Sequence, residues 1–351
     1  MKKIYHLYKT FQPFTYGGVE GYIESIISSK SSFNHYLLSI GDDKYNNKQK
    51  KIFKKNFSYS SDVISLKLFK YLLKNINKDK DLIHLHSPWP SMEIFLLICG
   101  FKNLIITYHS DIVRQKYINF FYKPINIFFL NNNVKKIVVT SKKYFETSYL
   151  LRKISNKKVK VIPIGISNAP YSPNINKDTR DSHIIFIGSN RSYKGIKLLD
   201  KVISSSSQKF VCIGSNLSSL RHNKNLKIYE NIDESLKIKL LSEASFMLMT
   251  SISRNEAFGI VLLEALRSGL PIISPNLNSG VSWVNKNQIT GYIYKTKSYD
   301  DIINKILKIN NLTSKKYIEL KSNARKRYES NFTLEIMNKE LNIVYNEYFN
   351  L

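Results

Sequence analysis

The sequence has little cysteine, the residue that forms disulfide frameworks and many metal sites. Only two cysteines occur among 351 residues, Cys99 and Cys212, and they lie in separate apolar segments. This separation excludes the close spacing of a cysteine metal site and the dense pattern of a disulfide scaffold. We therefore expect both cysteines to be buried packing residues.

Acidic residues are also scarce. Asp and Glu number 26 against 54 Lys and Arg, so the formal net charge is +28. Such an excess favours an anionic partner, whether nucleic acid, an anionic membrane surface or a phosphorylated substrate. A codon usage rich in Lys and Asn would produce the same excess. No nucleic-acid-binding signature occurs, so we expect no nucleic-acid partner.

Long apolar runs are missing. No stretch of about 18 apolar residues occurs, so we expect no membrane-spanning helix. The apolar start of the chain is too short for a signal peptide and is interrupted by Tyr5 and His6, so we predict a first strand there. We expect a cytoplasmic protein that is peripheral on the inner face of the plasma membrane.

What the chain does contain is a repeated alternation of short apolar strands and helical segments, typical of an α/β fold with doubly wound parallel sheets. A polar segment with two prolines interrupts this pattern. We predict two Rossmann-like domains that face a cleft. Their predicted bounds are 1–166 for the N-terminal domain, 167–182 for a linker, 183–330 for the C-terminal domain, and 331–351 for a C-terminal helix that packs back on the first domain.

The most informative stretch covers residues 250–271, where Glu256 and Glu264 flank an apolar segment. Thr250, Ser251 and Ser253 precede it and are the residue types that cap helices. We predict a loop at Glu256, a helix N-terminus near 258–260, and Glu264 inside the helix. An ideal helix would not place both carboxylates on one face, so they serve one ligand only if Glu256 lies on the loop. The helix N-terminus would offer backbone N–H groups to an anion.

Two further loops follow predicted strands. Gly17 and Gly18 come before a helical pattern, and such a pair either admits a phosphate or sugar to the backbone or forms an ordinary turn. Arg191 and Lys194 follow the strand that ends at Gly188. Lysine suits phosphate as a point charge and arginine as a fork, so this loop is a second candidate anion site.

Histidines stand at two predicted strand ends. His86 and His109 each close an apolar strand, where ligands bind in open α/β sheets, although a purely structural role is the alternative for each. We expect His84 to pack within its strand.

Aromatic and basic residues alternate over residues 112–130. We predict a membrane or acceptor surface that comprises Arg114, Lys116, Phe120, Phe121 and Lys123. The alternative is a core-facing helix pair that breaks near Pro124. The Lys- and Asn-rich residues 44–57 are expected to form a surface loop.

Taken in order along nearly the whole chain, these motifs resemble glycosyltransferase family 4, which comprises retaining nucleotide-sugar enzymes of the GT-B fold. The motifs are Glu-Ala-Phe-Gly-Ile-Val-Leu-Leu-Glu-Ala (256–265), Gly-Gly-Val-Glu (17–20), Thr-Tyr-His-Ser-Asp (107–111), Val-Ile-Pro-Ile-Gly (161–165), residues 188–195, and Ser-Gly-Val-Ser-Trp-Val (279–284).

The resemblance implies a role for each matching residue. Glu264 would hold the ribose, while Glu256 and the N–H groups of Ala257, Phe258, Gly259 and Ile260 would meet the sugar and diphosphate. Lys194 would neutralise the leaving diphosphate, Gly17 and Gly18 would lie over the phosphates, and His109 would lie near the donor sugar. The resemblance thus makes His109, Lys194 and Glu256 the catalytic candidates, with the first domain binding the acceptor and the second the nucleotide sugar.

Two departures from the family pattern stand out. The family arginine after the strand glycine is Ser189 here, which leaves Arg191 as its substitute. The polar Asn and Asp of the family turn near residue 165 are Ile164 and Ser167. No Asp-x-Asp motif lies at a predicted site, so we expect no metal and no cofactor; a UDP- or GDP-linked sugar would be a substrate.

The resulting hypothesis is a retaining hexosyltransferase that extends a lipid-linked glycan in O-antigen, capsule or lipopolysaccharide biosynthesis. The enzymatic alternative is a soluble transferase for a small acceptor. The non-enzymatic alternative is a basic binding protein that keeps the fold without catalysis.

Overall fold

A computed structural model describes residues 2–15, 17–59, 61–112, 116–168, 173–220 and 223–350, with only the backbone for 116–119 and 350. The chain divides into two compact units. Unit 1 contains Met1–Pro163 and Glu335–Leu351, and unit 2 contains Ile164–Leu334. Residues 173–182, which fall in the predicted linker, therefore belong to unit 2, and Thr179 Oγ1 there donates a hydrogen bond to the Ala244 carbonyl at 2.8 Å.

Unit 1 is built on a sheet that is parallel except for its edge strand β3. Among the described residues the strand order is β10-β9-β8-β7-β1-β2-β4-β3. The chain winds outward from β1 to one edge and then returns to the other side at β7, so its direction reverses between these two strands. The strands are β1 (Lys3–Tyr8), β2 (Asn34–Gly41), β3 (Tyr45–Asn46), β4 (Lys50–Lys54), β7 (Leu82–Ser87), β8 (Leu104–Tyr108), β9 (Val134–Val139) and β10 (Val159–Val161), beside the ribbon of β5 (Phe57–Tyr59) and β6 (Asp62–Ile64).

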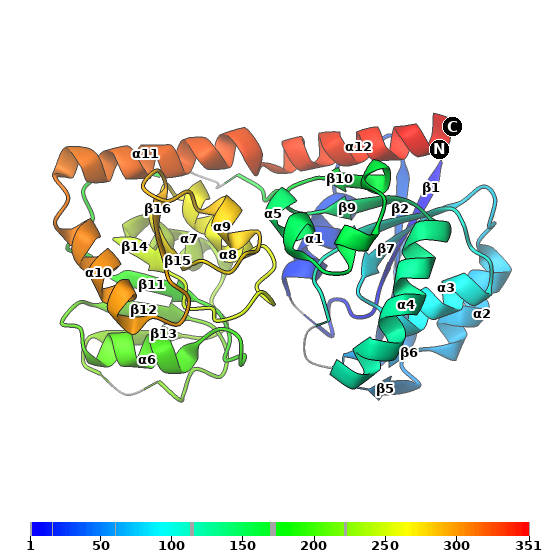
Figure 1. Cartoon of the computed structure of the whole chain (residues 1–351), viewed down its shortest axis with the longest axis horizontal. Helices are drawn as coiled ribbons and strands as arrows, with labels where there is room; N and C mark the ends of the chain where they lie inside the picture. Colours follow the sequence, from blue (N-terminus) through cyan, green and yellow to red (C-terminus); the bar gives the residue numbers. More distant parts are fainter. Residues whose placement is uncertain are drawn as a thin grey trace. The chain divides into compact units, whose positions relative to one another are not determined.

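The helices of unit 1 follow the strands and pack against the sheet. They are α1 (Gly18–Ile27), α2 (Leu66–Asn75), α3 (Pro90–Ile98), α4 (Lys116–Asn132), α5 (Lys142–Thr147) and α12 (Leu334–Asn350), with short 3-10 turns at Leu151–Lys153 and Asn156–Lys158. Helix α12, red in Figure 1, crosses several strands of this sheet. Its Glu340 pairs with Lys160 of β10 at 3.1 Å, and its Tyr345 hydroxyl shares a 2.7 Å hydrogen bond with His84 of β7.

Unit 2 is built on a second sheet whose strands are all parallel. The order within the described residues is β13-β12-β11-β14-β15-β16, the doubly wound order of nucleotide-binding folds. Its strands are β11 (Ile184–Ile187), β12 (Phe210–Ile213), β13 (Leu226–Tyr229), β14 (Phe246–Leu248), β15 (Ile272–Pro275) and β16 (Gly291–Tyr294). Its helices are α6 (Ile196–Ser204), α7 (Glu234–Glu243), α8 (Ile260–Arg267), α9 (Val281–Val284), α10 (Tyr299–Asn310) and α11 (Ser314–Asn331).

The core of unit 2 explains why these segments fold as they do. Alternate strand residues such as Phe210 and Phe246 are fully buried against the apolar stripes of α6 and α10, which contribute Leu199 and Ile306. Each stripe repeats at helical spacing, so burial of one helix face accounts for the pattern. The polar loops that follow the strands lie outside this core, at one edge of the sheet.

Two expectations about local structure are wrong. Residues 44–57 form β3, β4 and part of β5 instead of a loop, and β4 pairs with β2 in the main sheet. The alternative given for this stretch of residues 112–130, a helix pair that breaks near Pro124, is also wrong, because α4 (Lys116–Asn132) runs through this proline. A helix accommodates proline when packing of its other residues outweighs the lost hydrogen bond, and Phe129 and Leu130 are fully buried.

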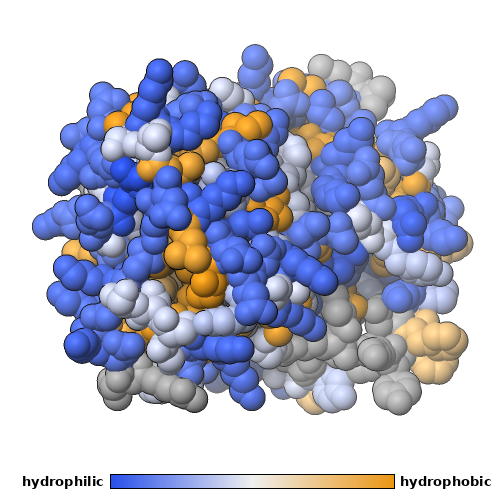
Figure 2. Space-filling view, turned by 60° about the vertical axis from the view of Figure 1, so that its left-hand side comes forward, coloured by the Kyte–Doolittle hydropathy of each residue, from blue (hydrophilic) through white to orange (hydrophobic). Residues whose placement is uncertain are grey.

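The described residues include no helix that is long and apolar enough to cross a membrane. Figure 2 shows a face on which hydrophilic side chains cover most of the surface and apolar ones form small separate patches.

Candidate functional site

The loops after β11 and β14 lie where the winding direction of unit 2 reverses, which is where open α/β sheets bind ligands. Lys194 comes from the first loop and Glu256 from the second, and Lys194 Nζ lies 2.7 Å from Glu256 Oε2. Ser251 Oγ donates a hydrogen bond to the same oxygen at 3.0 Å. The two charged side chains are 12% and 10% exposed, so the pair is largely buried but still reachable by a ligand.

A glycine joins the two loops. Gly195 adopts a left-handed conformation (φ +68°) at the start of α6, and a Cβ there would collide with the Thr250 carbonyl. Thr250 in turn donates a hydrogen bond from Oγ1 to the Lys194 carbonyl at 2.8 Å. The close approach that only glycine permits therefore holds Lys194 beside the loop that carries Glu256.

Helix α8 begins without a side-chain cap. Its N-cap is Gly259 (φ +80°), which lacks a side chain, so the expectation that Thr250, Ser251 or Ser253 caps this helix is wrong. Those residues bond instead to the Lys194 carbonyl, to Glu256 and to Asn255. The first backbone N–H groups of α8 are consequently available to an external acceptor.

The loop from Glu256 to Phe258 rests on the turn before α9. Ser279 Oγ donates a hydrogen bond to the Glu256 carbonyl at 2.8 Å, and the Gly280 N–H donates to the Ala257 carbonyl at 2.7 Å. A Cβ on Gly280 would lie 2.6 Å from that same carbonyl oxygen. These contacts therefore hold the loop that carries Glu256 in a fixed position against the turn.

Glu264 lies inside α8 and belongs to a separate charged group. Lys237 Nζ of α7 lies 2.9 Å from Glu264 Oε1 and 2.6 Å from Glu234. Burial lowers the pKa of Lys237, but Glu264 and Glu234 outweigh this effect and the net shift is upward. The second oxygen, Glu264 Oε2, is buried and accepts no hydrogen bond within the described structure. An unsatisfied buried acceptor costs about 1–3 kcal/mol, which a ligand hydroxyl would recover.

Arg191 does not join the Lys194–Glu256 pair. Its backbone N–H donates to the Ser189 carbonyl and its carbonyl accepts from Lys194, each at 2.8 Å, so it forms the turn before Lys194. Its side chain is exposed. The residue in the family arginine position, Ser189, accepts a hydrogen bond from Ser215 at 2.9 Å.

In unit 1, Gly17 and Gly18 open α1 as the sequence predicts. The α1 N-terminus also faces a carboxylate of its own: Glu20 Oε2 lies 2.6 Å from where a Cβ on Gly17 would be. Thr10 Oγ1 donates a hydrogen bond to Glu20 at 3.0 Å. A phosphate that approached Gly18 would have to compete with this carboxylate.

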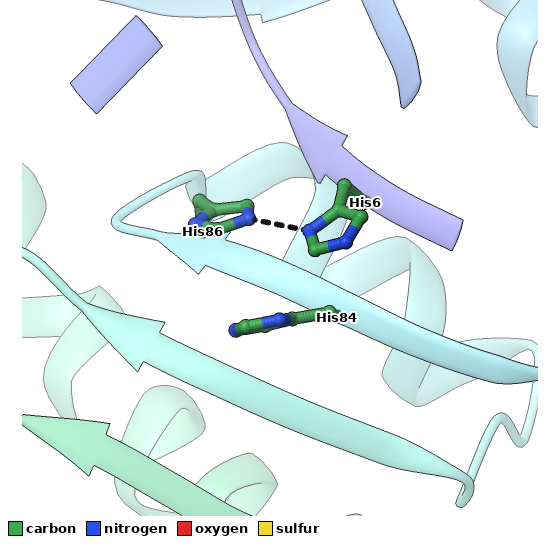
Figure 3. Close-up of side chains that lie close together, drawn as sticks. All are labelled: His6, His84 and His86. Carbon is green, nitrogen blue, oxygen red and sulfur yellow. Dashed lines mark hydrogen bonds between the residues drawn. The ribbon is translucent and has the colours of Figure 1, made fainter. Parts of the chain in front are cut away.

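His109 is part of a larger histidine cluster at the corresponding reversal point of unit 1. His6 of β1 lies opposite His84 of β7 in the sheet register, and Figure 3 shows these two rings beside that of His86. His86 shares 3.1 Å hydrogen bonds with both His6 and His109. His109 is 8% exposed, while His6, His84 and His86 are fully buried. Burial lowers the pKa of His109 to about 3, with a further contribution from the Lys9 charge.

Three of these rings could in principle approach one metal ion. Ring nitrogens of His6, His84 and His86 lie within 4.8 Å of one another. All their nitrogens are already hydrogen-bonded, however: His6 and His86 within the cluster, and His84 to Tyr345 and Thr107 at 2.7 Å each. A metal would have to break the His6–His86 bond and one His84 bond, so the arrangement fits hydrogen-bonded imidazoles better.

The predicted membrane surface is described only in part. Arg114 lies outside the described residues, and the side chain of Lys116 is not described. Phe120 and Phe121 are 73% and 74% exposed and contact each other edge to face, and Lys123 Nζ lies 5.0 Å from the Tyr149 ring. The exposed aromatic surface of α4 therefore exists, and the opposite side of the helix is buried.

Several residues that build the site were not predicted in that role, although Ser251 was expected as a helix cap and Ser279 belongs to a predicted motif. Ser251, Lys237 and Ser279 contact the two glutamates or their loop, and His6 and His35 extend the histidine cluster. Only the motif at 279–284 carried a signal, since a small residue followed by glycine indicates close backbone contact.

Two family models match consecutive parts of the chain. The model described as "Glycosyltransferase Family 4" matches residues 33–169, and that described as "Glycosyl transferases group 1" matches residues 168–327. The first region contains the strands of unit 1 from β2 onward but not β1, and the second contains all strands of the unit 2 sheet.

Similar proteins give the same picture. The O-antigen chain mannosyltransferase C of Escherichia coli is 29% identical, over 95% of both chains. The D-rhamnosyltransferase WbpZ of Pseudomonas aeruginosa is 28% identical, over 83% of this chain and 82% of its own. Among solved structures, sucrose-phosphate synthase from Thermosynechococcus elongatus superposes with a TM-score of 0.76 at 17% identity, over 100% of both chains. HepE from Anabaena in complex with UDP-glucose gives 0.76 at 15% identity, over 99% of this chain and 100% of its own. With the two family models, the doubly wound sheets and these relatives in agreement, the chain belongs to glycosyltransferase family 4 and has the GT-B fold.

Proposed function

We propose that this glycosyltransferase moves a hexose, with retention, from a nucleotide-diphosphate sugar to a lipid-linked glycan in O-antigen, capsule or lipopolysaccharide biosynthesis. The similarity to an O-antigen mannosyltransferase and a D-rhamnosyltransferase supports this pathway. The observation that carries the donor assignment is the geometry at the reversal point of unit 2, where a cation, a carboxylate and an uncapped helix lie together.

The donor-binding roles follow from the contacts of each group. Glu264 holds the ribose, because its Oε2 lacks a donor and accepts hydroxyl hydrogens once the carboxylate rotates. The backbone N–H groups at the start of α8 receive the diphosphate. Glu256 binds sugar hydroxyls through the oxygen that it does not share with Lys194 and Ser251.

The chemistry requires stabilisation of a leaving group more than a strong nucleophile. Breaking the glycosyl–phosphate bond leaves an anionic diphosphate and a cationic, oxocarbenium-like sugar. Lys194 exchanges its contact with Glu256 for the diphosphate as negative charge develops there, and Glu256 then faces the positive sugar. These groups supply the electrostatic needs of transfer without a metal ion. Arg191, whose side chain is exposed, adds a positive charge close to Lys194. His109 contacts the donor sugar.

The acceptor assignment rests on α4. Phe120, Phe121 and Phe128 are 73%, 74% and 56% exposed along this helix, and Lys123 lies among them. Exposed aromatics beside basic residues suit the interface of an anionic membrane. This feature favours a lipid-linked acceptor over a small soluble one, and a peripheral position on the membrane.

The donor proposal is tested by thermal stabilisation with UDP and GDP. We expect one nucleoside diphosphate to raise the melting temperature of the wild-type protein and of Glu243→Ala, an exposed glutamate on α7. Glu264→Ala should lose most of that shift, because the ribose loses its acceptor. Equal stabilisation of Glu264→Ala and wild type would refute the donor placement.

A second assay addresses the acceptor. The donors are radiolabelled sugars linked to the nucleoside diphosphate that stabilises the protein. Their transfer is measured to lipid-linked glycans extracted from membranes and to simple soluble glycosides. Transfer to the lipid-linked fraction supports the proposal, and efficient transfer to soluble glycosides alone would contradict it.

A further inference from the structure

A continuous row of imidazoles crosses the centre of the unit 1 sheet. It runs from His35 of β2 through His6 of β1 and His86 of β7 to His109, which follows β8. The links are His35 Nδ1 to His6 Nε2 at 2.9 Å, His6 Nδ1 to His86 Nε2 at 3.1 Å, and His86 Nδ1 to His109 Nε2 at 3.1 Å. Every link joins the δ nitrogen of one ring to the ε nitrogen of the next.

This alternation constrains the protons. A neutral imidazole carries one N–H and one bare nitrogen, so it donates one hydrogen bond and accepts the other. If His86 donates from Nε2, then His6 accepts at Nδ1 and must itself donate from Nε2. The same rule fixes His35 and His109, so all four rings carry the proton on Nε2, or all four carry it on Nδ1.

The rings are neutral at physiological pH. Burial lowers the pKa of His35 to about 4 and that of His109 to about 3, and it lowers the pKa values of His6 and His86 well below the ordinary range. Within the described residues, three titratable phenols pack on the row: Tyr8 of β1, Tyr22 of α1 and Tyr345 of α12. His84 of β7 acts on His6 and His86, and the Lys9 charge acts on His109. A charged ring inside the row would break the donor–acceptor pattern.

We propose that His35, His6 and His86 are positioning residues that set the tautomer of His109 through one shared proton arrangement. His109 Nδ1 is the end nitrogen of the row and has no partner within the described structure. In one arrangement it accepts a hydrogen bond from a hydroxyl, and in the other it donates one. The row therefore decides whether His109 Nδ1 donates a hydrogen bond to a sugar hydroxyl or accepts one from it.

His84 provides a matched control inside the same protein. It lies on β7 two residues before His86 and is equally buried. Its nitrogens bond to Tyr345 and Thr107 and not to another histidine. Its replacement should disturb packing as much as that of His86 while leaving the row intact.

The test is nitrogen NMR of ¹⁵N-histidine-labelled protein without ligand, where bare and protonated ring nitrogens resonate in separate regions. We expect one common tautomer for His6, His35, His86 and His109. In His86→Gln the row is cut, and the His109 signals should shift toward a mixture of tautomers. In His84→Gln they should stay at their wild-type positions.

Three results would overturn the proposal: mixed tautomers among the four rings of the wild type, equal shifts of His109 in both variants, or one bound metal ion per chain by elemental analysis. If His86→Gln does not fold, the wild-type spectrum still decides, and His35→Gln perturbs the row from its outer end.

The role of the row in recognition rests on the proposed function, since it takes His109 to face the donor sugar. Transfer kinetics test that part: His86→Gln should lower kcat about tenfold with an unchanged KM for the donor, while His84→Gln should retain wild-type values. Because the spectra need neither donor nor acceptor, failure of the proposed function and failure of the shared tautomer are distinguishable.

Discussion

The order in which the chain adds strands reverses at equivalent places in the two sheets, but the side chains at these places differ in charge. In unit 2 the reversal between β11 and β14 carries a charged pair, Lys194 and Glu256, at 2.7 Å. In unit 1 the reversal between β1 and β7 carries neutral histidines that are almost sealed from water. Fixed charges suit a ligand part that is itself charged, such as a diphosphate. Neutral donors and acceptors suit hydroxyl groups, whose recognition depends on direction more than on charge.

The largest effect should come from removing the cation of unit 2. Lys194→Gln is expected to lower kcat by roughly 10²–10³-fold, because developing charge on the diphosphate loses its counterion. Lys197→Gln, an exposed lysine on the adjoining helix α6, is the control and should retain activity. Steady-state transfer kinetics measure both. If Lys194→Gln kept full activity, the charged reversal point would not be where the reaction takes place.

The neutral reversal point should make the protein sensitive to acid. The histidines of the row bind protons in the unfolded chain near pH 6.5 but resist protonation in the folded state, with a pKa of about 4 for His35 and about 3 for His109. The unfolded state therefore binds more protons below pH 6.5, and stability falls as the pH falls from there toward about 4. Each such histidine contributes up to about 1.4 kcal/mol per pH unit within this window.

Urea unfolding at pH 7.5, 6.5, 5.5 and 4.5 measures this dependence. We expect little change between the first two values and a clear loss below them. His35→Gln should reduce the loss of unfolding free energy at low pH by the contribution of one histidine. If the unfolding free energy of the wild type stayed constant down to pH 4.5, the rings would accept protons within the folded protein.

A third comparison uses one glycine from each unit. Gly280→Ala places a Cβ against the Ala257 carbonyl and Phe258, so we expect a loss of about 1–3 kcal/mol in stability and weaker donor binding. Gly21→Ala in α1 meets nothing within 4 Å and should stabilise the protein by about 0.5–1 kcal/mol. Thermal unfolding with and without nucleotide measures both. Similar effects of the two changes would argue against a rigid loop at Glu256.

The smallest effect concerns the surface of unit 1. Phe120→Ser with Phe121→Ser should weaken binding to vesicles that contain anionic lipid by about tenfold, since two exposed aromatic side chains no longer enter the interface. Leu307→Ser, which removes an exposed apolar side chain from α10, is the control. Unchanged vesicle sedimentation of the double variant would leave α4 without a role at the membrane.

The sequence predicts well where signals are local. The alternation of strands and helices, the helix start at Gly18 and the loop position of Glu256 follow from spacing and turn residues, and the structure confirms them. Lys194 and Glu256 could be expected near each other because both follow strands whose carboxyl ends share one edge of the sheet.

What the sequence could not show depends on contacts between distant segments. The cap expected at Thr250 is wrong because its hydroxyl bonds to the Lys194 carbonyl of a neighbouring loop, while Ser251 bonds to Glu256 of its own loop. His6 and His35 carry no local sign of a shared row, since the order β8-β7-β1-β2 arises only when the sheet assembles. Likewise, β4 is Lys-rich near a sheet edge, where charge is tolerated and apolar alternation is weak.

Helix α12 determines the order in which the two units complete their packing during synthesis. Its Tyr345 bonds to His84 in the middle of the unit 1 sheet, yet all of unit 2 lies between these residues in the chain. A ribosome therefore releases every strand of both sheets before it makes the helix that covers β7, β9 and β10. During synthesis unit 2 can reach its final packing first, and the unit that begins the chain is the last to be finished.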